Sequence, residues 1–234
     1  MSVRLEGVVH SYDAPISEGR SIIDIDSWEI QPADQYLLRG VSGSGKTTLF
    51  NIMTGLLRPT KGTIRYDDIN LYSLSEASRD RFRAQNIGYV FQNHFLLNTL
   101  SAVENVEMPL AFSRILPQSQ WRSRASGLLT QVGLGNRLHY RPSQLSTGQR
   151  MRVAVARALA NNPKILFADE PTASLDETAS AMVMDLIQET CRVNRAMLIV
   201  ASHDPALVSR FSKFADLHAG QLTLSNAEGQ VTDV

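Results

Sequence analysis

Residues 40–47 have the types and the spacing that bind phosphate groups. They read GVSGSGKT and match G-x-x-x-x-G-K-[ST] at every fixed position. Glycines allow successive backbone N–H groups to converge on phosphate oxygens, and the helix that should follow adds partial positive charge. A Gly/Ser-rich turn before a helix is the alternative, but eight positions with suitable flanks favour a nucleotide site. The predicted phosphate-binding residues are Gly40, Val41, Ser42, Gly43, Ser44, Gly45, Lys46, Thr47 and Thr48.

Within this loop, two side chains have distinct expected tasks. Lys46 should bridge the β- and γ-phosphates of a nucleoside triphosphate, and the Thr47 hydroxyl should bind Mg²⁺. A dinucleotide-binding loop is excluded because G-x-G-x-x-G is absent and a lysine stands where the helix begins. The loop therefore predicts ATP-type chemistry with Mg²⁺ as cofactor.

A pair of carboxylates follows the apolar run 165–168. Asp169 and Glu170 come at the end where ligands bind in open α/β sheets. We expect Asp169 to hold Mg²⁺ and Glu170 to orient and polarise the attacking water. An apolar strand that simply runs into a turn could look the same. The phosphate loop earlier in the chain favours the functional interpretation.

Residues 145–149 read LSTGQ and precede a helical stretch. Ser146 and Gln149 have the spacing of a capping box, and a capped helix N-terminus is also an anion site. With the two motifs described above, this segment resembles the signature sequence of ABC ATPases, usually L-S-G-G-Q, with Thr147 in place of the first glycine. The resemblance covers nearly the whole chain, and within that family it is closest to ATPases for lipoprotein release, macrolide export and related cell-envelope tasks.

The resemblance implies roles for further residues. Gln92 would sense Mg²⁺ and the γ-phosphate, His203 would contact the γ-phosphate, and Tyr12 would stack on adenine. Asp176, in the segment ASLD, would lie at the interface of two chains, where the signature of one closes over ATP held by the other. The implied nucleotide-binding residues outside the phosphate loop are Tyr12, Ser146, Thr147, Gly148, Gln149 and Asp176; the metal ligands are Thr47, Gln92 and Asp169; and the catalytic residues are Glu170, His203 and Gln92.

The pattern of apolar runs predicts the elements that position these residues. Four runs are mostly apolar, with little alternation between apolar and polar residues, as in parallel strands covered by helices. They are 34–40, 86–92, 164–169 and 196–203. We expect an α/β fold, a P-loop NTPase core with a mostly parallel sheet, in one ABC ATPase domain over 1–234. An antiparallel β subdomain should form from about 1–31 and 60–73, with turns at 61–62 and 67–68. A helical subdomain should be inserted at about 93–160, between the core segments 1–92 and 161–234, and 217–224 should be the last strand.

Composition narrows the class of protein. Lys plus Arg equals Asp plus Glu at 23 each, so no basic surface for nucleic acid is indicated. One cysteine, Cys191, excludes an internal disulfide and suits a reducing compartment. The apolar runs are far shorter than the roughly 20 residues of a membrane span. We therefore expect a cytoplasmic chain, and the resemblance implies that it is peripheral on the inner face of the cytoplasmic membrane through its partner.

These observations predict a function with two classes of partner. The resemblance implies an ATPase that dimerises with a second copy of itself and powers a membrane export or mechanotransmission complex of the bacterial envelope. Its partners would be integral membrane subunits, with a periplasmic adaptor as a further component, and not nucleic acid. The alternatives are the ATPase of a nutrient importer and a soluble ABC ATPase of DNA maintenance. The latter would need long heptads or zinc modules, which the sequence lacks.

The segment 93–110 is the predicted site of contact with the membrane partner. It follows Gln92 and is rich in apolar side chains. We expect Leu100, Val103 and Val106 to pack internally. By contrast, Phe95, Leu96 and Leu97 should form a groove that receives a short helix of the membrane subunit.

Overall fold

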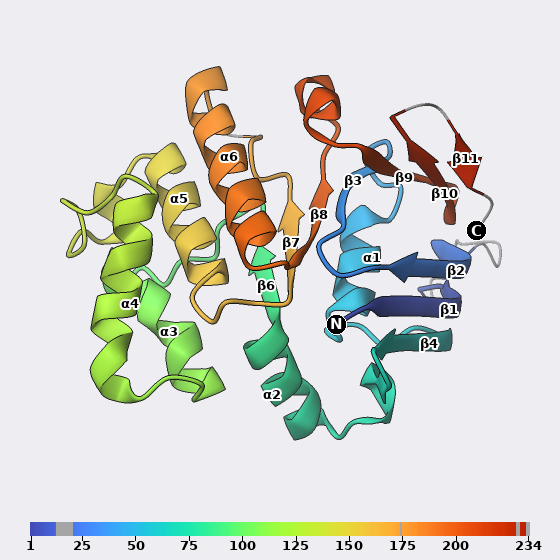
Figure 1. Ribbon diagram of the computed structural model, residues 1–234, viewed down its shortest axis with the longest axis horizontal. Coiled ribbons are helices and arrows are strands. Elements are labelled where there is room, and N and C mark those ends of the chain that lie inside the picture. Colours follow the sequence, from blue (N-terminus) through green and yellow to red (C-terminus); the bar gives the residue numbers. More distant parts are fainter. Residues whose placement is uncertain (13–20, 174, 228–229, 233–234) are drawn as a thin grey trace. The chain divides into compact units, whose positions relative to one another are not determined.

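The computed structural model describes residues 1–12, 21–173, 175–227 and 230–232. Residues 13–20, within the predicted N-terminal sheet region, and Ser174 of the ASLD segment lie outside this part. The chain forms two compact units (Figure 1). Unit 1 contains Met1–Asp80 and Ile199–Val234, and unit 2 contains Arg81–Leu198.

Unit 1 contains the predicted antiparallel sheet. β1 (Val3–His10) lies between β2 (Ile23–Ile30) and β4 (Lys61–Tyr66), and β5 (Ile69–Asn70) pairs with β4. Large apolar side chains such as Trp28 and Tyr66 are buried in its core. The turn expected at 67–68 is present, whereas the turn expected at 61–62 is wrong because both residues belong to β4. A Cβ at Gly62 would collide with the backbone of Gly7, where the register between β1 and β4 shifts, so this glycine serves a close strand contact.

A second sheet in unit 1 carries the strand that leads into the phosphate loop. β3 (Gln35–Arg39) pairs in parallel with β9 (Lys213–His218), which is followed by β10 (Gln221–Asn226) and β11 (Val231–Thr232). The expected single strand over 217–224 is therefore two strands. They are joined by a tight turn at 219–220, where Ala219 and Gly220 both have positive φ.

Helix α1 (Lys46–Met53) and two short 3-10 helices, η1 (Leu71–Ser73) and η3 (Pro205–Arg210), complete unit 1. Strand β8 (Met197–Ala201) is divided between the units. In unit 1 its end lies beside β3, and the Ser202 N–H just beyond it donates to the Leu38 carbonyl at 3.2 Å. In unit 2 its first residue, Met197, donates to the Lys164 carbonyl at 2.9 Å.

Unit 2 contains the strand of the carboxylate pair. β7 (Ile165–Asp169) pairs in parallel with β6 (Ile87–Val90), at the edge of the sheet. All five residues of β7 are buried, as expected for a strand covered on both faces. β6 alternates between buried and half-buried residues, which corrects the expectation that this strand is covered equally on both faces. Helix α2 (Glu76–Asn86) begins in unit 1 and leads into β6.

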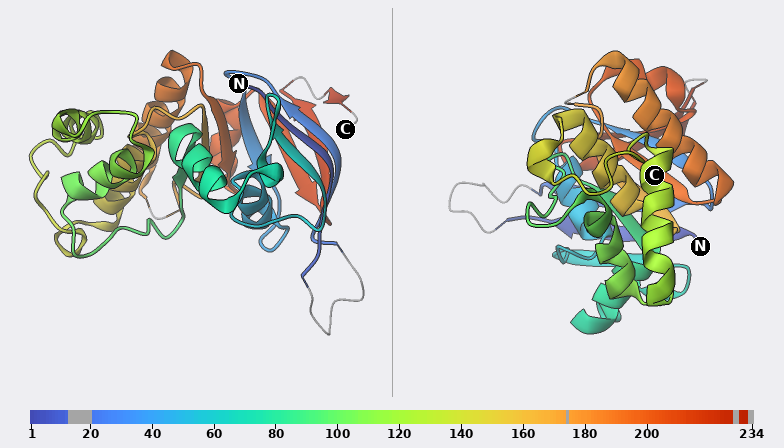
Figure 2. Two further views of the ribbon diagram at one scale, coloured as in Figure 1. Left: turned by 90° about the horizontal axis from the view of Figure 1, so that it is seen from below. Right: turned by 90° about the vertical axis from the view of Figure 1, so that its left-hand side faces the viewer.

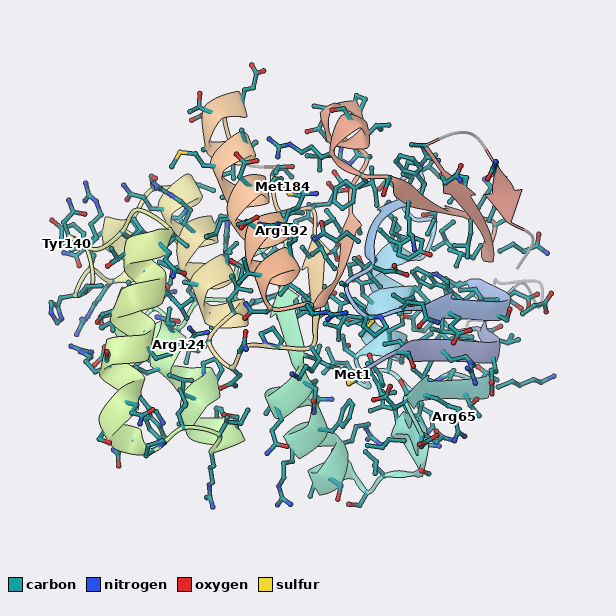
Figure 3. The ribbon with its side chains drawn as sticks, viewed as in Figure 1. Met1, Arg65, Arg124, Tyr140, Met184 and Arg192 are labelled. Carbon is teal, nitrogen blue, oxygen red and sulfur yellow. The ribbon has the colours of Figure 1, made fainter. Side chains whose placement is uncertain are left out.

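The predicted helical insert lies between β6 and β7, and no strand interrupts it. It contains α3 (Ala102–Ser113), α4 (Gln118–Gln131), η2 (Pro142–Gln144) and α5 (Thr147–Ala158), and α6 (Glu177–Val193) follows β7. Helices α3, α4 and α5 pack together in both views of Figure 2. Arg124 of α4, labelled in Figure 3, donates to the last carbonyls after α5, those of Leu159 and Ala160, and so fixes one helix against the other.

The predicted fold class, a P-loop NTPase core with a mostly parallel sheet, an antiparallel β subdomain and a helical insert, is thus confirmed. Over the ranges that the structure describes, none of the helices combines the length and the hydrophobicity that crossing a bilayer requires.

Candidate nucleotide-binding site

The phosphate loop joins the end of β3 to the start of α1, as its sequence predicts. Gly45 is the N-cap of α1 with φ 102°, a conformation that favours glycine. Because glycine has no side chain, the N-cap offers no side-chain hydrogen-bond acceptor to the first N–H groups of α1. The Lys46 ammonium group donates to the carbonyls of Gly40 at 2.7 Å and Val41 at 3.2 Å. The lysine therefore folds back over its own loop, which leaves a positive charge and a helix N-terminus at the same place.

Two further predicted residues belong to unit 1. Tyr12 is 47% exposed, and its hydroxyl group shares a 3.4 Å hydrogen bond with the hydroxyl group of Thr48, in the first turn of α1. Tyr12 is thus held beside the phosphate loop with nearly half of the residue accessible. His203 follows the buried Ser202 just beyond β8 and is exposed. The Asp204 carboxylate accepts from the Ala206 N–H and begins η3, so the chain turns directly after His203.

The carboxylate pair lies in unit 2. Asp169 ends β7 and Glu170 follows it, and only 7% and 8% of these residues are exposed. Glu170 has φ 48°, a strained conformation for a side chain of this size. Burial, and to a smaller degree the charge of Asp169, raises the pKa of Tyr89 on the neighbouring strand β6, so its hydroxyl keeps its proton at neutral pH. A buried carboxylate on a strained turn fits a functional site better than an ordinary loop.

The signature segment begins α5 as a capped helix. Ser146 is the N-cap, its hydroxyl accepting from the Gln149 N–H at 3.3 Å, while the Gln149 carboxamide accepts from the Ser146 N–H at 3.0 Å. The capping box and the expected anion site thus share the same residues.

The departure at Thr147 has a structural role that the sequence did not suggest. The guanidinium group of Arg150 donates to the Thr147 hydroxyl at 2.9 Å and to the Leu145 carbonyl at 2.8 Å. A glycine at 147 could not accept the first of these bonds. Arg150 was missed in the sequence, although a basic residue three positions after Thr147 on a helix is the signal that could have revealed it.

Removing this hydroxyl should destabilise the fold modestly. We expect Thr147→Gly to lower the free energy of unfolding by about 1–2 kcal/mol, because it removes a hydrogen bond to a charged group and adds backbone freedom. Thr147→Ser keeps the hydroxyl and should stay within about 0.5 kcal/mol of the parent. Urea unfolding followed by circular dichroism measures both. Equal stability of the glycine and serine variants would show that the bond to Arg150 contributes nothing.

The signature is also packed against the segment that follows the carboxylate pair. A Cβ at Gly148 would lie 3.1 Å from Leu175, so only a glycine allows this approach without a shift. Leu175 precedes Asp176, whose carboxylate caps α6 by accepting from the Ala179 N–H at 2.8 Å. Within unit 2, the predicted interface residue Asp176 and the signature are therefore neighbours. Leu175 is a second residue that sequence reasoning missed.

The segment after Gln92 is held in place by a buried arginine. Gln92 is exposed and lies two residues beyond the end of β6. The sequence predicts instead that Gln92 is the last residue of that strand. Arg157 of α5 donates to the carbonyls of His94 and Phe95. Burial and then the charge of Arg150 lower the pKa of His94, which favours the neutral form of its ring. A fixed backbone here gives Gln92 a defined position.

The predicted residues thus fall into two groups by unit. Tyr12, the phosphate loop and His203 belong to unit 1, whereas Gln92, the signature, the carboxylate pair and Asp176 belong to unit 2. A cavity of about 1130 Å³ in unit 2, lined mainly by α4 and α6, contains none of the predicted site residues.

Comparisons with known proteins agree with these motifs. The family model described as ABC transporter matches residues 23–173. The lipoprotein-releasing system ATP-binding protein LolD of Hydrogenovibrio crunogenus is 41% identical over 197 residues, which cover 84% of this chain and 85% of that protein. The macrolide export ATP-binding/permease protein MacB of Syntrophobacter fumaroxidans is 45% identical over 196 residues, which cover 83% of this chain. The chain spans only 27% of the length of MacB.

Solved structures give the same result at the level of the fold. The dimeric post-hydrolysis state of the ATP-binding cassette MJ0796 bound to ADP and Pi superposes with a TM-score of 0.90 at 32% identity. The match covers 97% of this chain and 100% of that chain. The family model spans more than half of this chain, and the similarity to LolD extends over 85% of that protein. This chain therefore belongs to the ABC transporter family, as an ATP-binding cassette.

Proposed function

We propose that the chain is the ATP-binding and ATP-hydrolysing subunit of a membrane export or mechanotransmission complex in a bacterial envelope. The observation that carries the proposal is the similarity to LolD, which extends over 84% of this chain and 85% of that protein. The name of that relative describes an ATP-binding protein of a lipoprotein-releasing system. In this role the whole chain acts as one ABC ATPase domain.

The residues of unit 1 fit a nucleoside triphosphate. The glycine-capped start of α1 and the Lys46 ammonium group offer donors and positive charge to the β- and γ-phosphates. When ATP enters, Lys46 exchanges its bonds to the loop carbonyls for bonds to phosphate oxygens. The exposed ring of Tyr12 offers a surface for adenine, and Thr48 keeps that ring beside the loop. His203 contacts the γ-phosphate.

Glu170 is the group that we assign to the attacking water. Its carboxylate is buried, so its charge is little screened by solvent. The strained backbone of Glu170 restricts the directions in which this side chain can point. Thr47, Gln92 and Asp169 supply oxygen ligands of the kind that Mg²⁺ prefers. Bound Mg²⁺ would neutralise charge on the phosphate oxygens. Asp169 and Gln92 would hold that ion, and Glu170 would polarise the attacking water.

We propose that two copies are needed for turnover. Ser146 and Gly148 lie at a helix N-terminus that suits an anion, on a unit other than that of the phosphate loop. They close over ATP held by the second copy, with Thr147 and Gln149 shaping the turn and Asp176 at the interface. Loss of the γ-phosphate contacts after hydrolysis shifts the balance back to separated chains.

The movement of the two copies is transmitted to integral membrane subunits on the cytoplasmic face of the membrane. A periplasmic adaptor completes the complex. The transmitting segment is the one that Arg157 holds after Gln92, since 61% of Phe95 and 45% of Leu97 are exposed. Leu96 and Leu100 are half-buried, while Val103 and Val106 are fully buried. The exposed pair supports the proposed groove for a helix of the membrane subunit.

Changing this pair should separate coupling from ATP hydrolysis. We expect the double variant Phe95→Ser and Leu97→Ser to lose co-purification with the membrane subunit, because the groove loses its apolar contacts. Basal ATPase activity and the melting temperature of the isolated chain should change little, since 61% of Phe95 and 45% of Leu97 are exposed and neither residue belongs to the buried core. Phe112→Ser is the matched control, because Phe112 is 69% exposed but lies at the end of α3. A sharp fall in melting temperature, or equal loss in the control, would contradict the assignment.

A further inference from the structure

Tyr12 rests on a buried histidine that no motif in the sequence explains. His10 ends β1, and only 7% of it is exposed. Its ring meets the ring of Tyr12 edge to face, with centroids 4.8 Å apart and planes at 89°. Among the described residues, neither ring nitrogen of His10 has a hydrogen-bond partner. The interaction described for this ring is the aromatic contact with Tyr12.

The backbone around His10 is held by hydrogen bonds on both sides of its strand, β1. On one side its carbonyl accepts from the Ile22 N–H at 2.9 Å, and it pairs with Ile23 of β2. On the other side the Val9 carbonyl accepts from the Thr60 N–H at 2.8 Å, just before β4. A ring held by a strand in the middle of its sheet is a rigid support.

Tyr12 is thus constrained at two points. The His10 ring limits its tilt, and the hydrogen bond to Thr48 ties its hydroxyl to α1. An exposed aromatic side chain without such support would lose rotational freedom when it stacks on a base, and that loss weakens binding.

We infer that His10 is a positioning residue for the nucleobase: it pre-orients the Tyr12 ring, so that affinity for ATP, but not for a bare polyphosphate chain, depends on an aromatic ring at position 10. This inference rests on the proposed role of Tyr12 in adenine binding. It adds His10 as a residue that favours ATP over a bare polyphosphate by supporting the Tyr12 ring, and both residues belong to unit 1.

Two variants of similar volume test the inference. His10→Leu fills the space without a ring, and His10→Phe restores a ring that can meet Tyr12 edge to face. Isothermal titration calorimetry would measure the dissociation constants of Mg-ATP and of magnesium tripolyphosphate, which carries no base. We expect His10→Leu to bind ATP about 2- to 10-fold more weakly, the range of an aromatic pair. Its tripolyphosphate affinity should not change, and His10→Phe should bind both ligands within about twofold of the parent.

The outcomes separate this inference from the proposed function. Unchanged ATP affinity in His10→Leu would overturn it, as would equal losses for ATP and tripolyphosphate, or a loss in His10→Phe as large as in His10→Leu. Tyr12→Ala in the parent tests the underlying contact. If that variant keeps the parent's ATP affinity, the role of Tyr12 fails. If it weakens ATP binding while His10→Leu does not, only the role of His10 fails.

Discussion

The variant Glu170→Gln is expected to bind ATP and to hydrolyse it at least about 100-fold more slowly than the parent, within the usual range for the loss of a general base. Glutamine keeps the length and shape of the side chain and tolerates the same buried position, but it cannot accept a proton from water. Because the proposed phosphate contacts do not include this carboxylate, affinity for Mg-ATP should remain close to that of the parent. Phosphate release at saturating ATP measures the rate, and calorimetry measures the affinity.

The same variant should accumulate as a dimer when ATP is present. Slow hydrolysis leaves the γ-phosphate in place, so the contacts from Ser146 and Gly148 of the second copy persist. Size-exclusion chromatography with and without ATP detects the change. Glu177→Gln is the matched control, since this glutamate is exposed at the start of α6 and should hydrolyse ATP as the parent does. Turnover by Glu170→Gln at the parent rate would remove Glu170 from the reaction.

Much of the fold could be predicted because its signals are local. The phosphate loop lies between an apolar strand and a helix, and β7 and β8 are buried along their whole length, as continuous apolar runs indicate. The errors came from backbone geometry. The dipeptide at 219–220 lacks the Asn-Gly or Asp-Gly signal of a tight hairpin, yet both residues take positive φ.

The site could be predicted as a set of motifs but not as a set of contacts. Motif spacing predicts roles for Lys46, Glu170 and Ser146, since each chemistry requires one residue type at a fixed offset. The bond from Arg150 to Thr147, the approach of Leu175 to Gly148 and the His10 ring beneath Tyr12 depend on side-chain directions. Such directions follow from the packing of elements that are distant in the chain, and sequence patterns do not encode them.

The variant Lys46→Ala is expected to lose both nucleotide affinity and turnover. It removes charge-assisted bonds to the phosphates worth about 1.5–3 kcal/mol, so the dissociation constant of Mg-ATP should rise roughly 10- to 100-fold. Calorimetry and phosphate release measure the two effects. Lys61→Ala is the control, because this lysine is exposed at the start of β4 in the same unit. Unchanged binding and turnover in Lys46→Ala would refute the assignment of the phosphate loop.

Lys46→Ala also tests whether the signature acts on the second copy. Ser146→Arg should block the signature with a bulky charge while leaving its own phosphate loop intact. In a heterodimer of the two variants, one composite site contains both Lys46→Ala and Ser146→Arg. The other site combines the intact Lys46 of the Ser146→Arg chain with the intact Ser146 of the Lys46→Ala chain. If each site is shared between copies, mixing should restore activity above the sum of the separate variants, with differently tagged chains to prove that heterodimers form. If loop and signature instead served the same ATP within one chain, every site in the mixture would carry one defect, and no activity would return.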